Sequence, residues 1–231
     1  MNIFDIVGPV MVGPSSSHTA GAVRIGRVSR KLLGSSVAAA RIGLHGSFRD
    51  TGKGHGTDRA LVAGLMGMAV DAPDIPRSLD IAAARGMEVS FEGVDLGDQV
   101  HPNSVRLNLT GQDGRELEVV AASVGAGRIM ITELDGLEAG FSGLTPTLIV
   151  HNVDQPGHVA EVTSMLQHKS VNIATMQLHR SGRGGNAVMV IECDQEVPPQ
   201  AVQWLEHLEG ITKVTYYSLL EPAECVDGEA E

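Results

Sequence analysis

The sequence predicts an α+β protein, in which an N-terminal α/β domain over residues 1–142 precedes a smaller domain over residues 146–221. Strand-like apolar runs alternate with apolar residues at helical spacing, which is typical of mixed α and β structure. Glycine is abundant, with 28 residues in a chain of 231, and many of these glycines mark loops and turns. The clearest pattern begins at Thr145. The last residues, 222–231, form an acidic tail.

Composition excludes several classes of protein. The net charge is −11 and only 3% of the residues are aromatic, which argues against nucleic-acid binding. A hydrophobic content of 42% excludes a disordered chain. No apolar run approaches the ~20 residues that span a bilayer. The N-terminus carries Asp5 and no early lysine or arginine, so it lacks the charged start of a signal peptide. We therefore expect a soluble, cytoplasmic protein with no membrane or nucleic-acid partner.

The first distinctive motif is the stretch from Gly13 to Gly21. After it, apolar residues at helical spacing predict a helix that Gly34 terminates. One of the serines is expected to cap this helix, and the remaining hydroxyls and amides at its positive end would suit a carboxylate or phosphate. The alternative is a serine-rich turn with one cap. The candidate residues of this motif are Ser15, Ser16, Ser17, His18 and Thr19.

A second glycine-rich stretch, residues 46–58, follows a short apolar segment over residues 37–44 and is expected to form a loop before the next helix. A P-loop is excluded because Lys53 is followed by glycine and not by serine or threonine. Lys53 and His55 are candidate donors to an anion, and Thr57 is the expected helix cap. The candidate residues here are Lys53, His55, Gly56 and Thr57.

Two further segments complete the first domain. His101 and Asn103 flank a proline just before a predicted strand over residues 105–109, and residues 123–131 are expected to be a loop that enters a strand. Three histidines (His18, His55 and His101) raise the question of a metal site. No two of them share a helix-face spacing and no carboxylate motif lies nearby, so we expect no metal site in this chain.

The C-terminal part contains six predicted elements. The order is βαββαβ, the ferredoxin-like arrangement. The predicted elements are a strand over 147–153, a helix from 158 to about 169, strands over 171–178 and 187–191 joined by a glycine-rich hairpin, a helix over 199–210 and a strand over 211–219.

The run from Val150 to Val159, followed by Val171 to Ala174, resembles an ACT domain, which is a ligand-sensing regulatory module. In ACT domains the loop after the first strand often binds an amino acid at a dimer interface, so the resemblance implies homo-association. Alternatively, Pro156 and Gly157 only form the turn and the module merely dimerises. The resemblance makes Asn152, Asp154, Gln155, Pro156 and Gly157 a candidate ligand loop, with His151 and His158 as nearby candidates.

Taken together, four segments resemble the beta subunit of iron–sulfur-dependent L-serine dehydratase, also called L-serine ammonia-lyase. They are the Ser15–Thr19 run, the Gly52–Asp58 run, the His101–Asn103 segment and the ACT-like segment. The first domain is then similar to the allosteric substrate-binding domain found in some 3-phosphoglycerate dehydrogenases. The resemblance implies a cytoplasmic lyase of amino-acid metabolism and gluconeogenesis that converts L-serine to pyruvate and ammonia. It also implies a heterodimer with a catalytic alpha subunit.

The resemblance places a [4Fe-4S] cluster on that alpha subunit. A cluster needs three or four thiolates, whereas this chain has only Cys193 and Cys225. We therefore expect this chain to supply serine binding, regulation and assembly, and to be inactive alone. No residue is assigned as catalytic, although His18 and His55 are candidates for helping to abstract the α-proton. The implied serine-binding set is Ser15, Ser16, Ser17, His18, Thr19, Lys53, His55, Gly56, Thr57, His101 and Asn103.

Two other functions remain open on the sequence alone. The first is a stand-alone amino-acid-sensing module that dimerises through its ACT-like segment. The second is a histidine-metal hydrolase. Serine binding by the N-terminal motifs could also be either allosteric or part of an active site shared with the partner.

Overall fold

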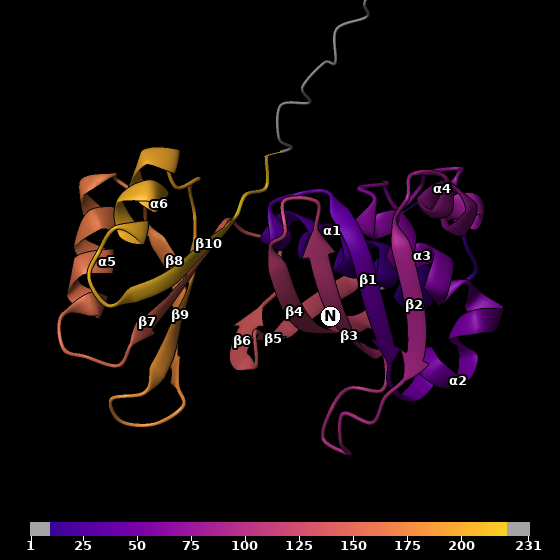
Figure 1. Ribbon diagram of the computed structural model, residues 1–231, viewed down its shortest axis with the longest axis horizontal. Coiled ribbons are helices and arrows are strands. Elements are labelled where there is room, and N and C mark those ends of the chain that lie inside the picture. Colours follow the sequence, from indigo (N-terminus) through magenta and orange to yellow (C-terminus); the bar gives the residue numbers. More distant parts are fainter. Residues whose placement is uncertain (1–9, 221–231) are drawn as a thin grey trace, which may run out of the picture.

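The structure, a computed structural model, describes residues 10–220. Asp5, Cys225 and the acidic tail therefore lie outside the described residues. The described chain forms two β-sheets, each with its helices on one face (Figure 1). We call them the six-stranded unit and the four-stranded unit. No helix of residues 10–220 is long and apolar enough to cross a membrane.

The six-stranded unit has the strand order β2-β1-β3-β4-β5-β6. Strands β1 and β2 are parallel and the remaining pairs are antiparallel, so the sheet is mixed. Its elements are the π-helical turn η2 (Ser16–Gly21), α1 (Ala22–Leu33), β1 (Val37–Leu44), α2 (Gly46–His55), α3 (Thr57–Leu65), the 3-10 turn η3 (Ile75–Arg77), α4 (Ser78–Ala84), β2 (Glu88–Gly93), β3 (Ser104–Gly111), β4 (Glu116–Gly125), β5 (Arg128–Leu134) and β6 (Leu137–Phe141).

Two glycines bring helices α1 and α3 close together. A Cβ on Gly26 would lie 2.4 Å from the carbonyl oxygen of Leu61, and a Cβ on Gly64 would lie 2.1 Å from that of Val23. Any larger residue at either position would force the two backbones apart. Part of the unusual glycine content therefore serves helix packing as well as turns.

The four-stranded unit has the order β10-β7-β9-β8, and all its pairs are antiparallel. The predicted βαββαβ order is confirmed. Helix α6 ends at Glu206 and not at Gly210, because the next residues form a turn that closes on Gly210 at φ +81°. The elements are β7 (Thr147–Val153), α5 (His158–His168), β8 (Ile173–Arg180), β9 (Asn186–Cys193), α6 (Pro199–Glu206) and β10 (Ile211–Tyr217).

The central strands β7 and β9 of the four-stranded sheet are buried on both faces. One face, which includes Leu148 and Met189, packs in one cluster with residues of α5 and α6. The other face contributes Ile149, Val188 and Val190 to the hydrophobic core of the six-stranded unit. The two units therefore share a core, and the Tyr217 hydroxyl adds a hydrogen bond of 3.0 Å to the carbonyl oxygen of Gly143.

Two predictions about the six-stranded unit are wrong. Residues 46–58 are not a loop: α2 occupies Gly46–His55, because tertiary packing overrides the poor helix propensity of glycine. Thr57 does not cap α3. Gly56, at φ +71°, takes the cap position, and the Thr57 hydroxyl is buried without a hydrogen-bond partner among residues 10–220.

The prediction for residues 123–131, a loop that enters a strand, is right about the strand, since β5 begins at Arg128. The loop is shorter than expected, because β4 runs to Gly125. The tight turn between them is made by Ala126 and Gly127, both at positive φ.

Candidate functional site

The serine-rich motif forms the entry to α1. Ser15 is the predicted serine cap: its Oγ accepts a hydrogen bond of 3.2 Å from the backbone N–H of His18. The backbone N–H of Thr19 bonds the carbonyl oxygen of Ser15 at 2.8 Å. Gly13 fits against this turn, since a Cβ there would lie 2.4 Å from Oγ1 of Thr19. The motif is therefore a compact turn that fixes where His18 points.

His18 is buried at the centre of four hydroxyl groups, with 8% of its surface exposed. Its Nδ1 lies 3.2 Å from Ser17 Oγ and 3.4 Å from Ser15 Oγ. Its Nε2 lies 3.1 Å from Thr51 Oγ1 and 3.3 Å from Ser47 Oγ. The ring of Phe48, from the same helix α2, packs edge-on at 5.2 Å. Two segments far apart in sequence thus meet on one imidazole.

His55 stacks on this group at the C-terminal end of α2. Its ring centroid lies 4.8 Å from that of His18. Its Nδ1 lies 3.0 Å from the carbonyl oxygen of Thr51. A carbonyl oxygen only accepts, so Nδ1 carries the proton and Nε2 carries the lone pair. That Nε2 has no hydrogen-bond partner among residues 10–220. We call Ser15, Ser17, His18, Ser47, Thr51 and His55 the His18 cluster.

The electrostatics keep His18 uncharged near neutral pH. Burial lowers the pKa of His18 and the adjacent His55 lowers it further, while a hydrogen bond with the Ser47 backbone acts in the opposite direction. A neutral imidazole has one donor and one acceptor nitrogen, which suits a ring with hydroxyls at both ends.

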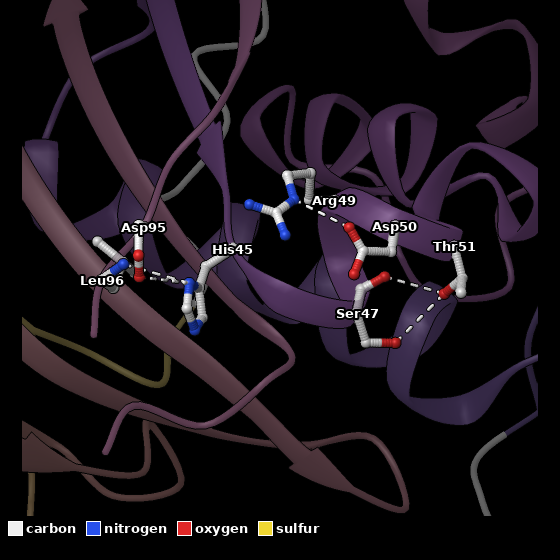
Figure 2. Close-up of polar contacts among 7 residues, drawn as sticks. All are labelled: His45, Ser47, Arg49, Asp50, Thr51, Asp95 and Leu96. Atoms are coloured by element: carbon white, nitrogen blue, oxygen red, sulfur yellow. Dashed lines mark hydrogen bonds and ion pairs between the residues drawn. The ribbon is translucent and has the colours of Figure 1, made fainter. Parts of the chain in front are cut away.

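The start of α2 is anchored on its other side by His45, a residue that the sequence did not single out. Its Nδ1 accepts a hydrogen bond of 3.2 Å from the backbone N–H of Leu96 and lies 4.0 Å from a carboxylate oxygen of Asp95 (Figure 2). Ser47 and Thr51 bond each other one turn apart on the same helix (Figure 2). These contacts hold in place the helix that carries half of the His18 cluster.

The remaining predicted residues lie outside the cluster. Lys53 is exposed and makes no hydrogen bond or ion pair with another described residue. His101 is exposed, and its Nδ1 accepts from the backbone N–H of Asn103. The carbonyl oxygen of Asn103 in turn accepts from the backbone of Ser123. The buried hydroxyl of Thr19 has no partner in the described part of the chain. The structure therefore unites Ser15, Ser17, His18 and His55, and no described contact joins Lys53, His101 or Asn103 to them.

The loop between β7 and α5 has a different character. Asp154 accepts hydrogen bonds from the backbone of Gly184 at 3.0 Å and from Arg180 at 3.2 Å, and these interactions lower the pKa of its carboxyl group. Asp154 thus fixes the β8–β9 hairpin. Asn152 and His158 are buried, and Asn152 Oδ1 and His158 Nε2 have no partner among residues 10–220. Gln155, Pro156 and Gly157 are exposed.

Cys193 does not fit a cluster ligand. It is fully buried in β9. Burial raises the pKa of its thiol, and the negative charge of Asp194 adds to this effect, so that the pKa is about 11. Metal binding uses the thiolate, which such a site disfavours. No group of three or more histidine, cysteine or acidic side chains in residues 10–220 is placed to hold a metal ion.

Comparisons with known proteins cover nearly the whole chain. The family model for the serine dehydratase beta chain matches residues 2–133, and the model for the ACT domain matches residues 146–209. A probable L-serine dehydratase beta chain of Bacillus subtilis is 41% identical over 93% of this chain and 96% of its own length. The L-serine dehydratase beta chain of Peptoniphilus asaccharolyticus is 34% identical over 92% of this chain and 96% of its own length.

A more distant similarity involves another enzyme. A D-3-phosphoglycerate dehydrogenase of Methanocaldococcus jannaschii is 24% identical over 59% of this chain but only 26% of its own length. The full-length matches are therefore those to the two beta chains, and this chain belongs to the serine dehydratase beta chain family, with a C-terminal ACT domain.

Proposed function

We propose that this chain is the beta subunit of an L-serine ammonia-lyase. Together with an alpha subunit it would remove water from L-serine, and hydrolysis of the resulting aminoacrylate would yield pyruvate and ammonia. The observation that carries this proposal is the full-length similarity to a beta chain of the same size, at 41% identity. The stand-alone sensor is not favoured, because the relatives with full-length similarity are named as subunits of a dehydratase.

The iron–sulfur cluster of such an enzyme would belong to the alpha subunit. In this chain the described cysteine is buried and its thiol pKa is raised, so it is unsuited to ligate iron. We infer that this chain alone has no lyase activity and acts in a cytoplasmic heterodimer whose product, pyruvate, is available for gluconeogenesis.

The surface around the His18 cluster is the proposed place of contact with serine. His55 Nε2 carries a lone pair, and the ring beside it, that of His18, is buried and uncharged. His55 can therefore accept a proton. In the shared-site form of the proposal, His55 takes the α-proton of serine in the partner's active site. In the allosteric form, serine binds this surface and alters the partner's activity. The carboxylate contacts would come from Lys53 on α2, from Gly56 and from Thr57 at the start of α3. The segment from His101 to Asn103 and the Ser15–Thr19 turn, Ser16 included, would add to them.

Substitution of His55 tests this role in the assembled enzyme. Pyruvate formation from L-serine is measured after co-expression with an alpha subunit of the same enzyme. If His55 is the base, His55→Gln lowers kcat by about 10²-fold or more. If serine binds allosterically, the half-saturating serine concentration changes instead. Unchanged values of both would show that His55 has no ligand role.

His168→Gln provides a closely matched control. His168 also donates from Nδ1 to the carbonyl oxygen four residues earlier, that of Ser164, but it lies on α5. Its substitution is expected to leave kcat unchanged. Co-purification of both subunits confirms for each variant that assembly is intact, so that a loss of activity is not a loss of the partner.

The ACT domain is proposed to bind an amino acid at its β7–α5 loop and to mediate homo-association. The support is the pair of buried, unpartnered atoms, Asn152 Oδ1 and His158 Nε2, since such atoms are costly unless a ligand or water satisfies them. Calorimetric titration of the wild-type chain and of Asn152→Ala with L-serine tests it. Equal heats from the two proteins would refute a ligand role for this loop.

A further inference from the structure

Thr51 is the residue that touches both histidines of the His18 cluster. Its side-chain Oγ1 lies 3.1 Å from His18 Nε2, and its backbone carbonyl oxygen lies 3.0 Å from His55 Nδ1. Thr51 lies in the middle of α2, one turn before His55. The two contacts use different groups of the same residue, so both rings are held relative to one backbone position.

The hydroxyl of Thr51 determines which nitrogen of His18 carries the proton. Thr51 Oγ1 donates its single hydrogen to the carbonyl oxygen of Ser47, at 2.9 Å (Figure 2). It can then only accept from His18, so His18 is protonated at Nε2. His18 Nδ1 is left as an acceptor, and Ser17 and Ser15 each place a hydroxyl within reach of it.

The carbonyl oxygen of Thr51 determines the proton on His55. A carbonyl has no hydrogen to give, so His55 must donate from Nδ1, which is the opposite tautomer to that of His18. The lone pair of His55 is then on Nε2. A ring that gains a proton at Nε2 keeps its Nδ1–H on the Thr51 oxygen, and that hydrogen bond strengthens with the charge.

We propose that Thr51 is a positioning residue that holds His18 and His55 in opposite tautomers and thereby makes His55 Nε2 the basic nitrogen of the cluster. The tautomers are a property of this chain alone. Their effect on turnover rests on the function proposed above, so the two are tested separately.

The first test reads the tautomers directly. Nitrogen-15 NMR of the full chain labelled at histidine distinguishes protonated from unprotonated ring nitrogens, and His18→Gln and His55→Gln variants assign the two rings. Wild type is expected to show His18 protonated at Nε2 and His55 at Nδ1. In Thr51→Val, Ser47 Oγ remains near His18 Nε2 and can donate or accept, so His18 is expected to become a mixture, while His55 is unchanged.

Rescue and control variants complete this experiment. Thr51→Ser keeps the hydroxyl and is expected to restore the single His18 tautomer. Thr163→Val on α5 removes an equivalent bond, from Thr163 Oγ1 to the carbonyl oxygen of Val159, far from any cluster histidine, and is expected to change neither ring. A His55 protonated at Nε2 in wild type, or a His18 tautomer that Thr51→Val leaves unaltered, would overturn the proposal.

The second test asks whether the positioning affects turnover in the assembled enzyme. Thr51→Val is expected to lower kcat about tenfold and to leave KM unchanged. A tenfold loss is at the lower end of the effect of residues that orient another group. Thr51→Ser is expected to restore kcat. If Thr51→Val alters the His18 tautomer but not kcat, the contribution of that tautomer to turnover fails and the tautomer assignment stands, while His55→Gln tests the role of His55 separately. If the tautomer is unaltered, the positioning role fails whatever the activity.

Discussion

Two turns that precede helices were expected to bind a ligand, and they differ in whether their buried side chains have hydrogen-bond partners. In the His18 cluster, a buried imidazole has hydroxyls at both nitrogens. In the loop between β7 and α5, Asn152 Oδ1 and His158 Nε2 are buried without partners among residues 10–220. Both nitrogens of the His18 ring have partners without a ligand, whereas Asn152 Oδ1 and His158 Nε2 would gain a partner from one. We therefore expect the candidate site in the six-stranded unit to be preorganised and the candidate site in the four-stranded unit to depend on its ligand.

The largest expected difference is in the cost of replacing the two histidines. His18→Leu removes hydrogen bonds at both nitrogens of a buried ring and leaves the surrounding hydroxyls without this partner, so it should lower the free energy of unfolding by about 2–4 kcal/mol. His158→Leu removes one bond to the half-exposed Glu161 and a buried unpartnered nitrogen, so it should cost about 1 kcal/mol or less. Urea denaturation of both variants measures this. Equal costs would remove the distinction between the two sites.

The next difference concerns the glycines of the two turns. A Cβ on Gly21 would lie 2.0 Å from Ser123 Oγ, so Gly21→Ala should destabilise the chain by about 1–3 kcal/mol. Gly157 has nothing within 4 Å, and Gly157→Ala meets only the strain of φ +112°, about 1 kcal/mol. Denaturation midpoints compare them. Adding Ser123→Ala to Gly21→Ala should recover part of the loss, and no recovery would show that the clash lies elsewhere.

Much of the fold was predictable because it depends on local patterns. The helix end at Gly34 and the βαββαβ order both follow from spacing and turn residues. The prediction for the glycine-rich stretch over 46–58 was wrong. Local propensity suggested a loop, whereas burial of Phe48 and Gly52 stabilises a helix.

The candidate site was only half predictable, for a related reason. His18 and His55 were expected, but Ser47 and Thr51 were missed because a loop gives them no common face. On a helix, Ser47, Thr51 and His55 are four residues apart and share one face. Their contact with His18 joins elements that are far apart in sequence. Residue spacing alone cannot predict such a tertiary contact.

His18 and Asp154 should also respond to acid in different pH ranges. The folded-state pKa of His18 is lowered from 6.5, so folded chains bind this proton less readily than unfolded ones. Stability is therefore complete above pH ~6.5 and decreases as the pH falls below it. The pKa of Asp154 is lowered from 3.8, so its contribution is present above that value and lost only at lower pH. Unfolding free energies between pH 7 and 5 should fall in wild type and fall less in His18→Gln. An equal pH slope in the two proteins would show that His18 does not titrate as described.

The smallest expected effect is that of Asp154→Asn, and it tests whether the loop is held by its own contacts or left for a ligand. Asp154 accepts from Gly184 and Arg180 at the surface, where charged contacts contribute little to stability. Asparagine keeps one acceptor oxygen but loses the charge, so the unfolding midpoint should hardly move. Hydrogen exchange at the Gly184 amide should nevertheless quicken, because that bond loses its charge assistance. The amide of Asn186, which bonds Ser181 Oγ in the same hairpin, serves as the internal reference. If both amides exchange as in wild type, Asp154 does not fix the hairpin, and its carboxylate is then available to a ligand of the ACT domain.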